Sequence, residues 1–281
     1  MERLSSTFPI VDTYPGFPKL GFCRDTSSSM TMGHESLLEL LAKLTSHEDQ
    51  DDDEDDDDDD DDSEFGPEYC VPGTVHWHTR EFFVRAINQH PGQAAVVDLG
   101  CGWGELTQHL VRDCPNKRFV GVDIDPSRIR EAKEKIGCRA RLKAADICGR
   151  TPLRTGHYQF ALMSWVICSL IDDQLAAAAC EARRLLKAGG RLLLALGHPC
   201  FQIGPEAGIH CESWSSGRRI RFGGRNVGIS RSYQHVTDIL SQHGLSLTEG
   251  FLLESDPDRG PLPLDSLTEN SHATLLAFTR Q

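Results

Sequence analysis

Val96-Val97-Asp98-Leu99-Gly100-Cys101-Gly102-Trp103-Gly104 is the stretch that decides the fold of this chain. An apolar run leads into three alternating glycines, and helical spacing of apolar residues follows over 103–112. A chain that leaves a buried strand and enters a helix this abruptly needs backbone conformations that glycine adopts cheaply. Glycine also lets a ligand lie directly on the backbone. The stretch therefore predicts a ligand-binding loop at the carboxyl edge of a parallel sheet.

The glycine spacing separates two kinds of nucleotide-binding loop. A dinucleotide loop has a third Gly or Ala three positions after the second glycine, but Glu105 stands there and the third glycine comes early, at Gly104. Asp123 closes the next apolar run, where a carboxylate grips a ribose diol in either kind of site. GxGxG with an acid two residues before it resembles the first motif of class I S-adenosylmethionine-dependent methyltransferases.

The resemblance continues over roughly residues 70–281. Asp146 follows Asp123 by 23 residues, 160–165 is similar to the family's fourth strand, and 185–194 is similar to its helix, Gly-Gly turn and fifth strand. The resemblance implies S-adenosylmethionine as cofactor, with its tail on the glycine loop and its ribose bound by Asp123. It also implies that Asp146 and Ile147 frame the adenine and that the methionine portion lies beside Ser164. The cofactor-binding residues it implies are Asp98, Gly100, Cys101, Gly102, Gly104, Asp123, Ile124, Asp146, Ile147 and Ser164.

The periodicity of the chain agrees with an α/β fold. Four runs are almost continuously apolar, as expected of strands buried on both faces: 94–99, 118–123, 158–164 and 190–196. Helical stretches are expected at 78–90, 103–112, 126–136, 172–187 and from Ser232 through Leu240. Segments 245–253 and 272–279 are expected to form a closing antiparallel hairpin. We predict a Rossmann-like, doubly wound sheet of seven strands, of which the first five are parallel.

Candidates for the acceptor side come from segments that vary in such enzymes. His198, in an HPxF segment after the fifth strand, is a candidate base, with a purely structural histidine as the alternative. Arg80 could pair with the donor's carboxylate. Residues 202–230 are interpreted as a lid-like insertion, whose arginines could clamp an acidic small molecule, touch RNA phosphates, or simply be solvated. Candidate substrate-binding residues are Tyr69, His76, Trp77, Trp214 and Arg218.

Three classes of function follow. The first is methyl transfer to an O or N atom of a small molecule by in-line displacement. Ser164-Trp165-Val166-Ile167 stands where an (N/D)PPY tetrad would be, which argues against amino-group methylation by the route that uses that tetrad. The second is a protein or RNA methyltransferase recruited through the N-terminal extension. The third is a protein with this fold that transfers no methyl group.

The N-terminal part of the chain has a different composition. Residues 48–62 hold 14 acids in 15 positions, and without them the formal net charge of −13 would be about +1. A tract this charged repels itself and has nothing to bury, so we expect residues 1–64 to be a disordered extension and 65–281 to be the methyltransferase domain. Leu37–Leu44 has one apolar helical face and an LxxLL pattern, so this helix or the acidic tract could dock a protein partner.

Ten cysteines include no CxxC pair and no His–Cys cluster with zinc spacing, so we expect no metal. We interpret Cys168 and Cys180 as small apolar core residues, and the cysteines together as reduced thiols. No apolar run reaches the ~18 residues of a membrane span. The near-neutral charge outside the acidic tract argues against nucleic acid as a partner. We expect a cytoplasmic protein, with nuclear entry left open.

Overall fold

The computed structural model describes residues 74–197, 209–214, 217–222, 225–254, 260–266 and 271–281. The chain divides into two compact units, Met1–Met32 and Gly33–Gln281, and every described residue lies in the second. Several predictions fall outside the described residues. They are the extension 1–64 with its acidic tract 48–62, the Leu37–Leu44 helix, Tyr69 and His198.

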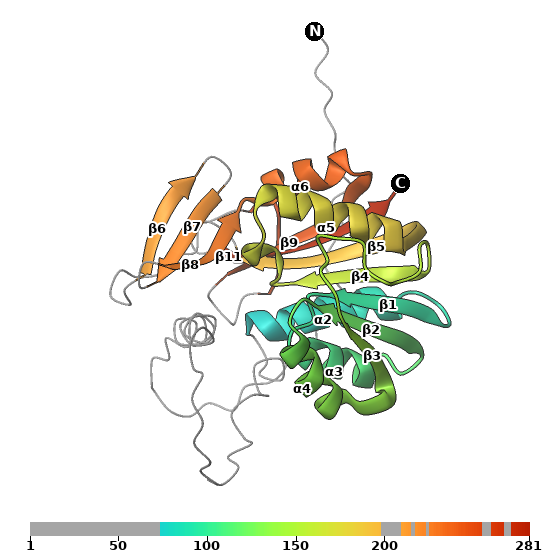
Figure 1. Ribbon diagram of the computed structural model, residues 1–281. Helices are drawn as coiled ribbons and strands as arrows, with labels where there is room; N and C mark the ends of the chain where they lie inside the picture. The colour runs from blue at the N-terminus through green and yellow to red at the C-terminus, as the bar shows by residue number, and fades with distance from the viewer. Residues whose placement is uncertain (1–73, 198–208, 215–216, 223–224, 255–259, 267–270) are drawn as a thin grey trace, which may run out of the picture. The chain divides into compact units, whose positions relative to one another are not determined.

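An eight-stranded sheet forms the centre of the described unit, in the order β10-β9-β11-β5-β4-β1-β2-β3 (Figure 1). Strands β1 to β5 run parallel to one another, whereas β11 is antiparallel to both β5 and β9. Its strands are β1 (Ala94–Leu99), β2 (Lys117–Asp123), β3 (Ala140–Ala144), β4 (Tyr158–Ser164), β5 (Leu186–Gly197), β9 (Leu245–Glu254), β10 (Leu262–Pro263) and β11 (Ser271–Arg280).

Helices cover both faces of this sheet. Figure 1 shows α2, α3 and α4 on one face and α5 and α6 on the other. The alternating side chains of β1 divide accordingly: Val96 packs with α2 and α3, and Val97 packs with α5 and α6. The helices are α2 (Val75–Asn88), α3 (Glu105–Asp113), α4 (Pro126–Ile136), α5 (Asp172–Leu185) and α6 (Tyr233–Gln242), with short 3-10 turns η1 (Gly137–Arg139) and η2 (Ile167–Ser169).

The predicted Rossmann-like fold is confirmed, with differences at the sheet's edges. The sheet has eight strands rather than seven, because the two-residue β10 pairs with β9 beyond the expected closing hairpin. Strand β3 was not among the apolar runs, since it is an edge strand that buries only Leu142 and exposes Arg141 and Lys143. The expected Gly-Gly turn lies inside β5, where its register against β4 shifts between Leu186 and Arg191 and Gly189 has φ of 70°.

The segment interpreted as an insertion forms a sheet of its own. Strands β6 (Ile209–Trp214), β7 (Gly217–Phe222) and β8 (Arg225–Arg231) pair antiparallel, in that order. Side chains of β8 attach this sheet to the main one: the Ser230 hydroxyl donates to the Gly197 carbonyl at the end of β5, and Arg231 binds the segment after β4. A role as a lid stays a prediction.

Cysteine packing differs from expectation. Cys180 is exposed on α5 and Cys168 is only half-buried, whereas Cys101 and Cys114 are buried. Helix α5 is amphipathic, and Cys180 lies on its outer face. Within the described ranges, no helix is long and apolar enough to cross a membrane, and no group of three or more His, Cys, Asp or Glu residues is placed to hold a metal ion.

Candidate active site

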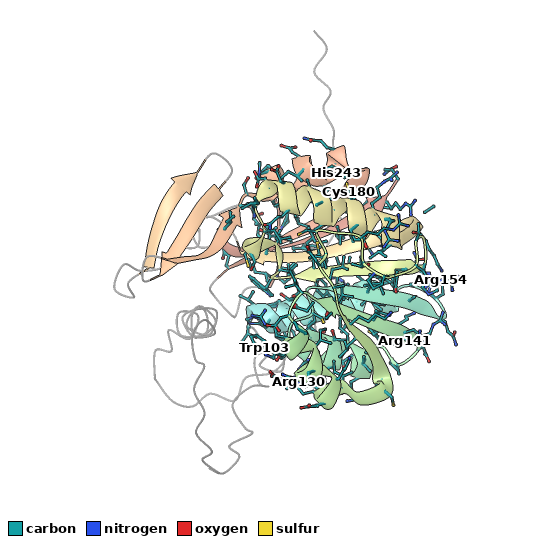
Figure 2. The ribbon with its side chains drawn as sticks, in the orientation of Figure 1. Trp103, Arg130, Arg141, Arg154, Cys180 and His243 are labelled. Carbon is teal, nitrogen blue, oxygen red and sulfur yellow. The ribbon has the colours of Figure 1, made fainter. Side chains whose placement is uncertain are left out.

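The glycine loop between β1 and α3 is held by the neighbouring strand. The backbone amides of Gly100 and Cys101 both donate to the Val122 carbonyl, at 2.8 and 3.0 Å. The Gly102 amide donates to Oδ2 of Asp123 at 2.9 Å. The side chain of Trp103 leans onto α4, where the Arg128 guanidinium lies 4.5 Å from its ring centroid (Figure 2). The loop is therefore fixed against β2 and α4.

Two glycines of this loop show why the spacing matters. At Gly100, with φ of 81°, a Cβ would lie 2.4 Å from Cγ2 of Val166, so the loop and the segment after β4 touch. At Gly102, with φ of 54°, a Cβ would meet nothing within 4 Å. Gly100 thus permits close packing of protein on protein, whereas Gly102 borders open space at the carboxyl edge of the sheet.

Asp98 is a buried carboxylate beneath the loop. Its Oδ2 accepts a 2.6 Å hydrogen bond from the Thr107 hydroxyl of α3, whereas its buried Oδ1 has no hydrogen-bond partner in the described part of the chain. Burial raises the pKa of Asp98 to about 6; the charges of Asp123 and Glu105 raise it further, and the Thr107 hydrogen bond opposes them. An unsatisfied buried oxygen of this kind costs free energy unless a donor reaches it.

The ends of β2 and β3 form the next part of the site. Asp123 is buried, and its two carboxylate oxygens accept from the amides of Gly102 and Asp125. Each oxygen keeps a lone pair for a further donor. Ile124 is 69% exposed, an unusual position for a large apolar side chain. After β3, Ile147 is buried, and exposed Asp146 accepts from the Cys148 amide at 2.8 Å.

The end of β4 supplies polar atoms from the other side. The pairing of Asp98 with Leu162 places Ser164 level with Gly100. The Ser164 hydroxyl and the Trp165 indole nitrogen are both buried without a hydrogen-bond partner among the described residues. Among the described residues, Trp165 is also the one non-glycine residue with a positive φ, at 60°. The ring centroids of Trp165 and of His76 in α2 are 5.5 Å apart.

The structure therefore brings together most of the cofactor-binding residues that the sequence predicts. Trp165 and Val166 were missed as site residues, although their place directly after the fourth strand was a usable signal. A backbone conformation disfavoured for a bulky side chain, next to an unsatisfied buried donor, is typical of functional sites.

Other candidates lie elsewhere or outside the described side chains. Both Nε and one terminal nitrogen of Arg80 lie 2.7 Å from Oδ2 of Asp113. Asp113 ends α3, so Arg80 lies about 13 Å along that helix from the glycine loop, at 1.5 Å per residue. The expected pairing of Arg80 with the donor is therefore not supported. Trp77 packs its ring on His78. Trp214 and Arg218 flank the β6–β7 turn, as the backbone register shows.

Residues 96–190, from β1 into β5, match the family model described as a methyltransferase domain. The chain carries a methyltransferase domain. The match takes in the glycine loop, Asp123, Asp146 and Ser164, and it ends at the Gly-Gly turn. The acceptor-side segments at 69–80 and 198–230 lie outside it.

The methyltransferase domain resembles curated proteins over part of their length. Malonyl-[acyl-carrier protein] O-methyltransferase of Hahella chejuensis is 27% identical over 141 residues, covering 48% of this chain and 50% of that protein. A shorter match, 44% identical over 61 residues, covers 21% of this chain and 22% of tRNA (guanine-N(7)-)-methyltransferase of Porphyromonas gingivalis. The chain thus spans half or less of the length of these two relatives.

Solved structures share the fold of the methyltransferase domain. A TehB-like SAM-dependent methyltransferase from Corynebacterium glutamicum superposes with a TM-score of 0.51 at 19% identity, over 75% of this chain and 89% of that one. At this identity the likeness establishes the fold, the class I methyltransferase fold.

The polar atoms left without partners test whether this methyltransferase domain fits S-adenosylmethionine. The donor carries an ammonium, a carboxylate, a ribose diol and a sulfonium. Asp98 Oδ1 and the Ser164 hydroxyl have no hydrogen-bond partner among the described residues, a Cβ at Gly102 would meet nothing within 4 Å, and Asp123 retains acceptor capacity for hydroxyls. These residues fit the donor.

Proposed function

We propose that the chain is an S-adenosylmethionine-dependent methyltransferase that acts on a small-molecule acceptor at an O or N atom. The observation that carries the proposal is the pair of unsatisfied buried oxygens, Asp98 Oδ1 and Ser164 Oγ, on the two strand ends that flank the open glycine loop. Buried oxygens are normally hydrogen-bonded within the protein, so a fold without a ligand would not be expected to leave both of these oxygens without a partner. The methyltransferase domain model spans both residues.

S-adenosylmethionine supplies an electrophilic methyl group for in-line displacement. The chain's own residues mainly position the reactants. Asp98 Oδ1 accepts from the donor's ammonium, the loop at Gly102 lies against its tail, and Asp123 accepts from the ribose hydroxyls. Ile124 and Ile147 cover the adenine faces, beside Asp146. Alignment of this kind supplies several kcal/mol of the barrier reduction.

We propose that the acceptor binds on the side of the site where Trp165 and His76 lie together. The Trp165 indole N–H is a buried donor without a partner in the described chain, so an acceptor molecule with a carbonyl or carboxylate oxygen would satisfy it. The relative named as malonyl-[acyl-carrier protein] O-methyltransferase supports oxygen as the receiving atom. His198 remains the candidate for a base where the acceptor needs one.

Binding of the donor is the first test. Calorimetric titration of S-adenosylmethionine should give saturable binding to the wild type, weakened about tenfold or more by Asp123→Ala, which removes charge-assisted hydrogen bonds. Because Asp123 also holds the Gly102 amide, Asp123→Asn is the matched variant that retains an acceptor for the loop. No binding to a folded wild type would contradict the proposal.

A macromolecular acceptor is the alternative, and the short match to a tRNA methyltransferase favours it over a protein without activity. Recruitment through the N-terminal extension would make methyl transfer depend on residues 1–64. Deletion of these residues should leave turnover of a small-molecule acceptor within about twofold, since the donor site uses none of them. Loss of transfer with unchanged donor affinity would establish the macromolecular alternative instead.

A further inference from the structure

A cysteine and a histidine meet on the α5–α6 face, away from the methyl-transfer site. Sγ of Cys180, in the third turn of α5, lies 3.1 Å from Nδ1 of His243, the C-cap residue of α6. Cys180 is exposed and His243 is half-buried. Figure 2 shows the two side chains together at the top of the view, with Trp103 of the glycine loop far below them.

The pair borders a depression that also holds an arginine. Cys180, Arg183, Gln242, His243 and Gly244 line an open depression of about 340 Å³. Arg183 lies one helical turn after Cys180, on the same face of α5. Its guanidinium lies against Gly244, where a Cβ would be 2.7 Å from Nε. Arg183 forms no ion pair with any residue that the structure describes, so its charge is available to a thiolate or to a bound anion.

We propose that Cys180 is a thiol-modification site, activated by His243, that takes small disulfides bearing carboxylates. The thiol proton moves from Sγ to Nδ1 of His243. The thiolate then attacks one sulfur of the disulfide; the new Cys180–sulfur bond forms as the old sulfur–sulfur bond breaks. The electron pair leaves with the second sulfur as a thiolate, which is protonated from solvent or from His243. Cys180 is oxidised to a mixed disulfide and the small disulfide is reduced.

The chemistry of the depression defines the ligand class. A thiolate is the reactive form of cysteine, and adjacent cations favour it. Arg183 suits a carboxylate on the incoming molecule, because a guanidinium binds carboxylates with paired hydrogen bonds. The residues that line the depression are polar or small, so none of them would select a lipid. Methyl transfer plays no part in this site, so it stands independently of the function proposed above.

The test compares two exposed cysteines in one protein. Cys138, in η1, is exposed like Cys180 and has no histidine partner in the described structure. Full-length protein is treated with limiting iodoacetamide near neutral pH, and each cysteine peptide is quantified by mass spectrometry. Cys180 should be alkylated about tenfold faster than Cys138, and His243→Gln should bring its rate close to that of Cys138 without changing Cys138.

Oxidised glutathione then tests the ligand class. Cys180 should form the mixed disulfide, and Arg183→Gln should slow this reaction at least about threefold while changing the iodoacetamide rate less, because iodoacetamide carries no carboxylate. Buried Cys101 and Cys114 report folding, since they stay unreactive only in a folded variant. Equal rates for Cys180 and Cys138 in the wild type, or a fast Cys180 in folded His243→Gln, would overturn the proposal.

Discussion

Among single residues, Asp98 shows how the site stores free energy. Ionising this carboxyl inside the protein is costly because burial removes its hydration, and the charges of Asp123 and Glu105 add to that cost. The Thr107 hydroxyl compensates on one oxygen only. The cationic end of a bound donor would compensate on the other. In the proposed function, the free energy that Asp98 costs the unbound protein would be recovered when the donor binds.

The raised pKa makes stability depend on pH with a definite sign. Between about pH 4 and 6 the unfolded chain ionises Asp98 while the folded protein retains the proton, so stability falls as pH rises and then levels off. The total is roughly 3 kcal/mol for a shift of about two pKa units. We expect denaturant unfolding at pH 4.5, 5.5 and 6.5 to show that the free energy of unfolding of Asp98→Asn rises relative to that of the wild type as pH increases. A difference between the two proteins that stays constant with pH would contradict this account.

Gly102 and Gly92 form a matched pair for the donor contact. Both have positive φ, 54° and 71°, and a Cβ at either would meet no protein atom within 4 Å. Because both positions have positive φ, alanine at either should lower the free energy of unfolding by a similar amount, about 1 kcal/mol. Gly102→Ala should also weaken S-adenosylmethionine binding about tenfold or more, since its methyl group occupies the space beside the loop. Calorimetry on both variants checks this; equal affinities would place the donor elsewhere.

The positions of several candidate site residues were predictable from backbone requirements. Alternating glycines after a buried strand predict the loop, and the positions of Asp123 and Ser164 follow from the strand ends that they occupy. The place of Trp165 directly after the fourth strand could have marked it as a candidate, but its positive φ and its contact with His76 of α2 could not be predicted from the sequence. Arg80 was misplaced because an arginine at the start of a helix does not show which acid it will meet, here Asp113.

At the scale of elements, Arg231 joins the β6–β8 sheet to the main one. Its side chain is 1% exposed and donates to the Asp172 carboxylate of α5 and to the carbonyls of Ile167 and Leu170. His235 of α6 bonds the second oxygen of Asp172 at 2.9 Å. The segment that follows Trp165 is thereby tied to both the small sheet and α6.

Removing this arginine should be strongly destabilising. Arg231→Met removes a fully buried cation from Asp172 and from the carbonyls of Ile167 and Leu170, which costs about 3–5 kcal/mol. Arg191→Met is the control: its ion pair with Glu249, 2.9 Å long, is partly exposed and should be worth under about 1 kcal/mol. Adding Asp172→Asn to Arg231→Met should recover part of the loss in a double-mutant cycle. Additive losses in denaturant unfolding would contradict the coupling.

Element boundaries followed the hydrophobic pattern closely where both faces of a strand are buried. Strands β1 and β4 have the bounds that their apolar runs predict, and α4 begins at Pro126 and ends at Ile136 as expected. Strand β3 was missed because an edge strand needs only one buried side chain. The β6–β8 sheet was missed because arginines and glycines in that segment mask the alternation that marks a strand.

At the scale of the whole molecule, the residues that carry the net charge and the candidate donor-binding residues lie in different parts of the sequence. The acidic tract at 48–62 accounts for the entire formal charge of −13, whereas the proposed donor-binding residues lie between 98 and 164. A small-molecule enzyme should therefore tolerate a change in the charge of the tract, and a macromolecular methyltransferase recruited by that charge should not.

Neutralising the tract at constant length separates these cases. Replacing its 14 acids by Asn and Gln preserves the length and polarity of the segment and shifts the formal net charge to about +1. Donor affinity and small-molecule turnover should stay within about twofold at physiological salt, because none of the proposed donor-binding residues lies in the tract and salt weakens long-range charge effects. Deletion of residues 48–62 is the companion variant, because it removes the charge and the length of the tract together. Turnover lost in the neutral variant, with donor affinity retained, would show that the acidic charge recruits the acceptor, and the acceptor would then be a basic macromolecule.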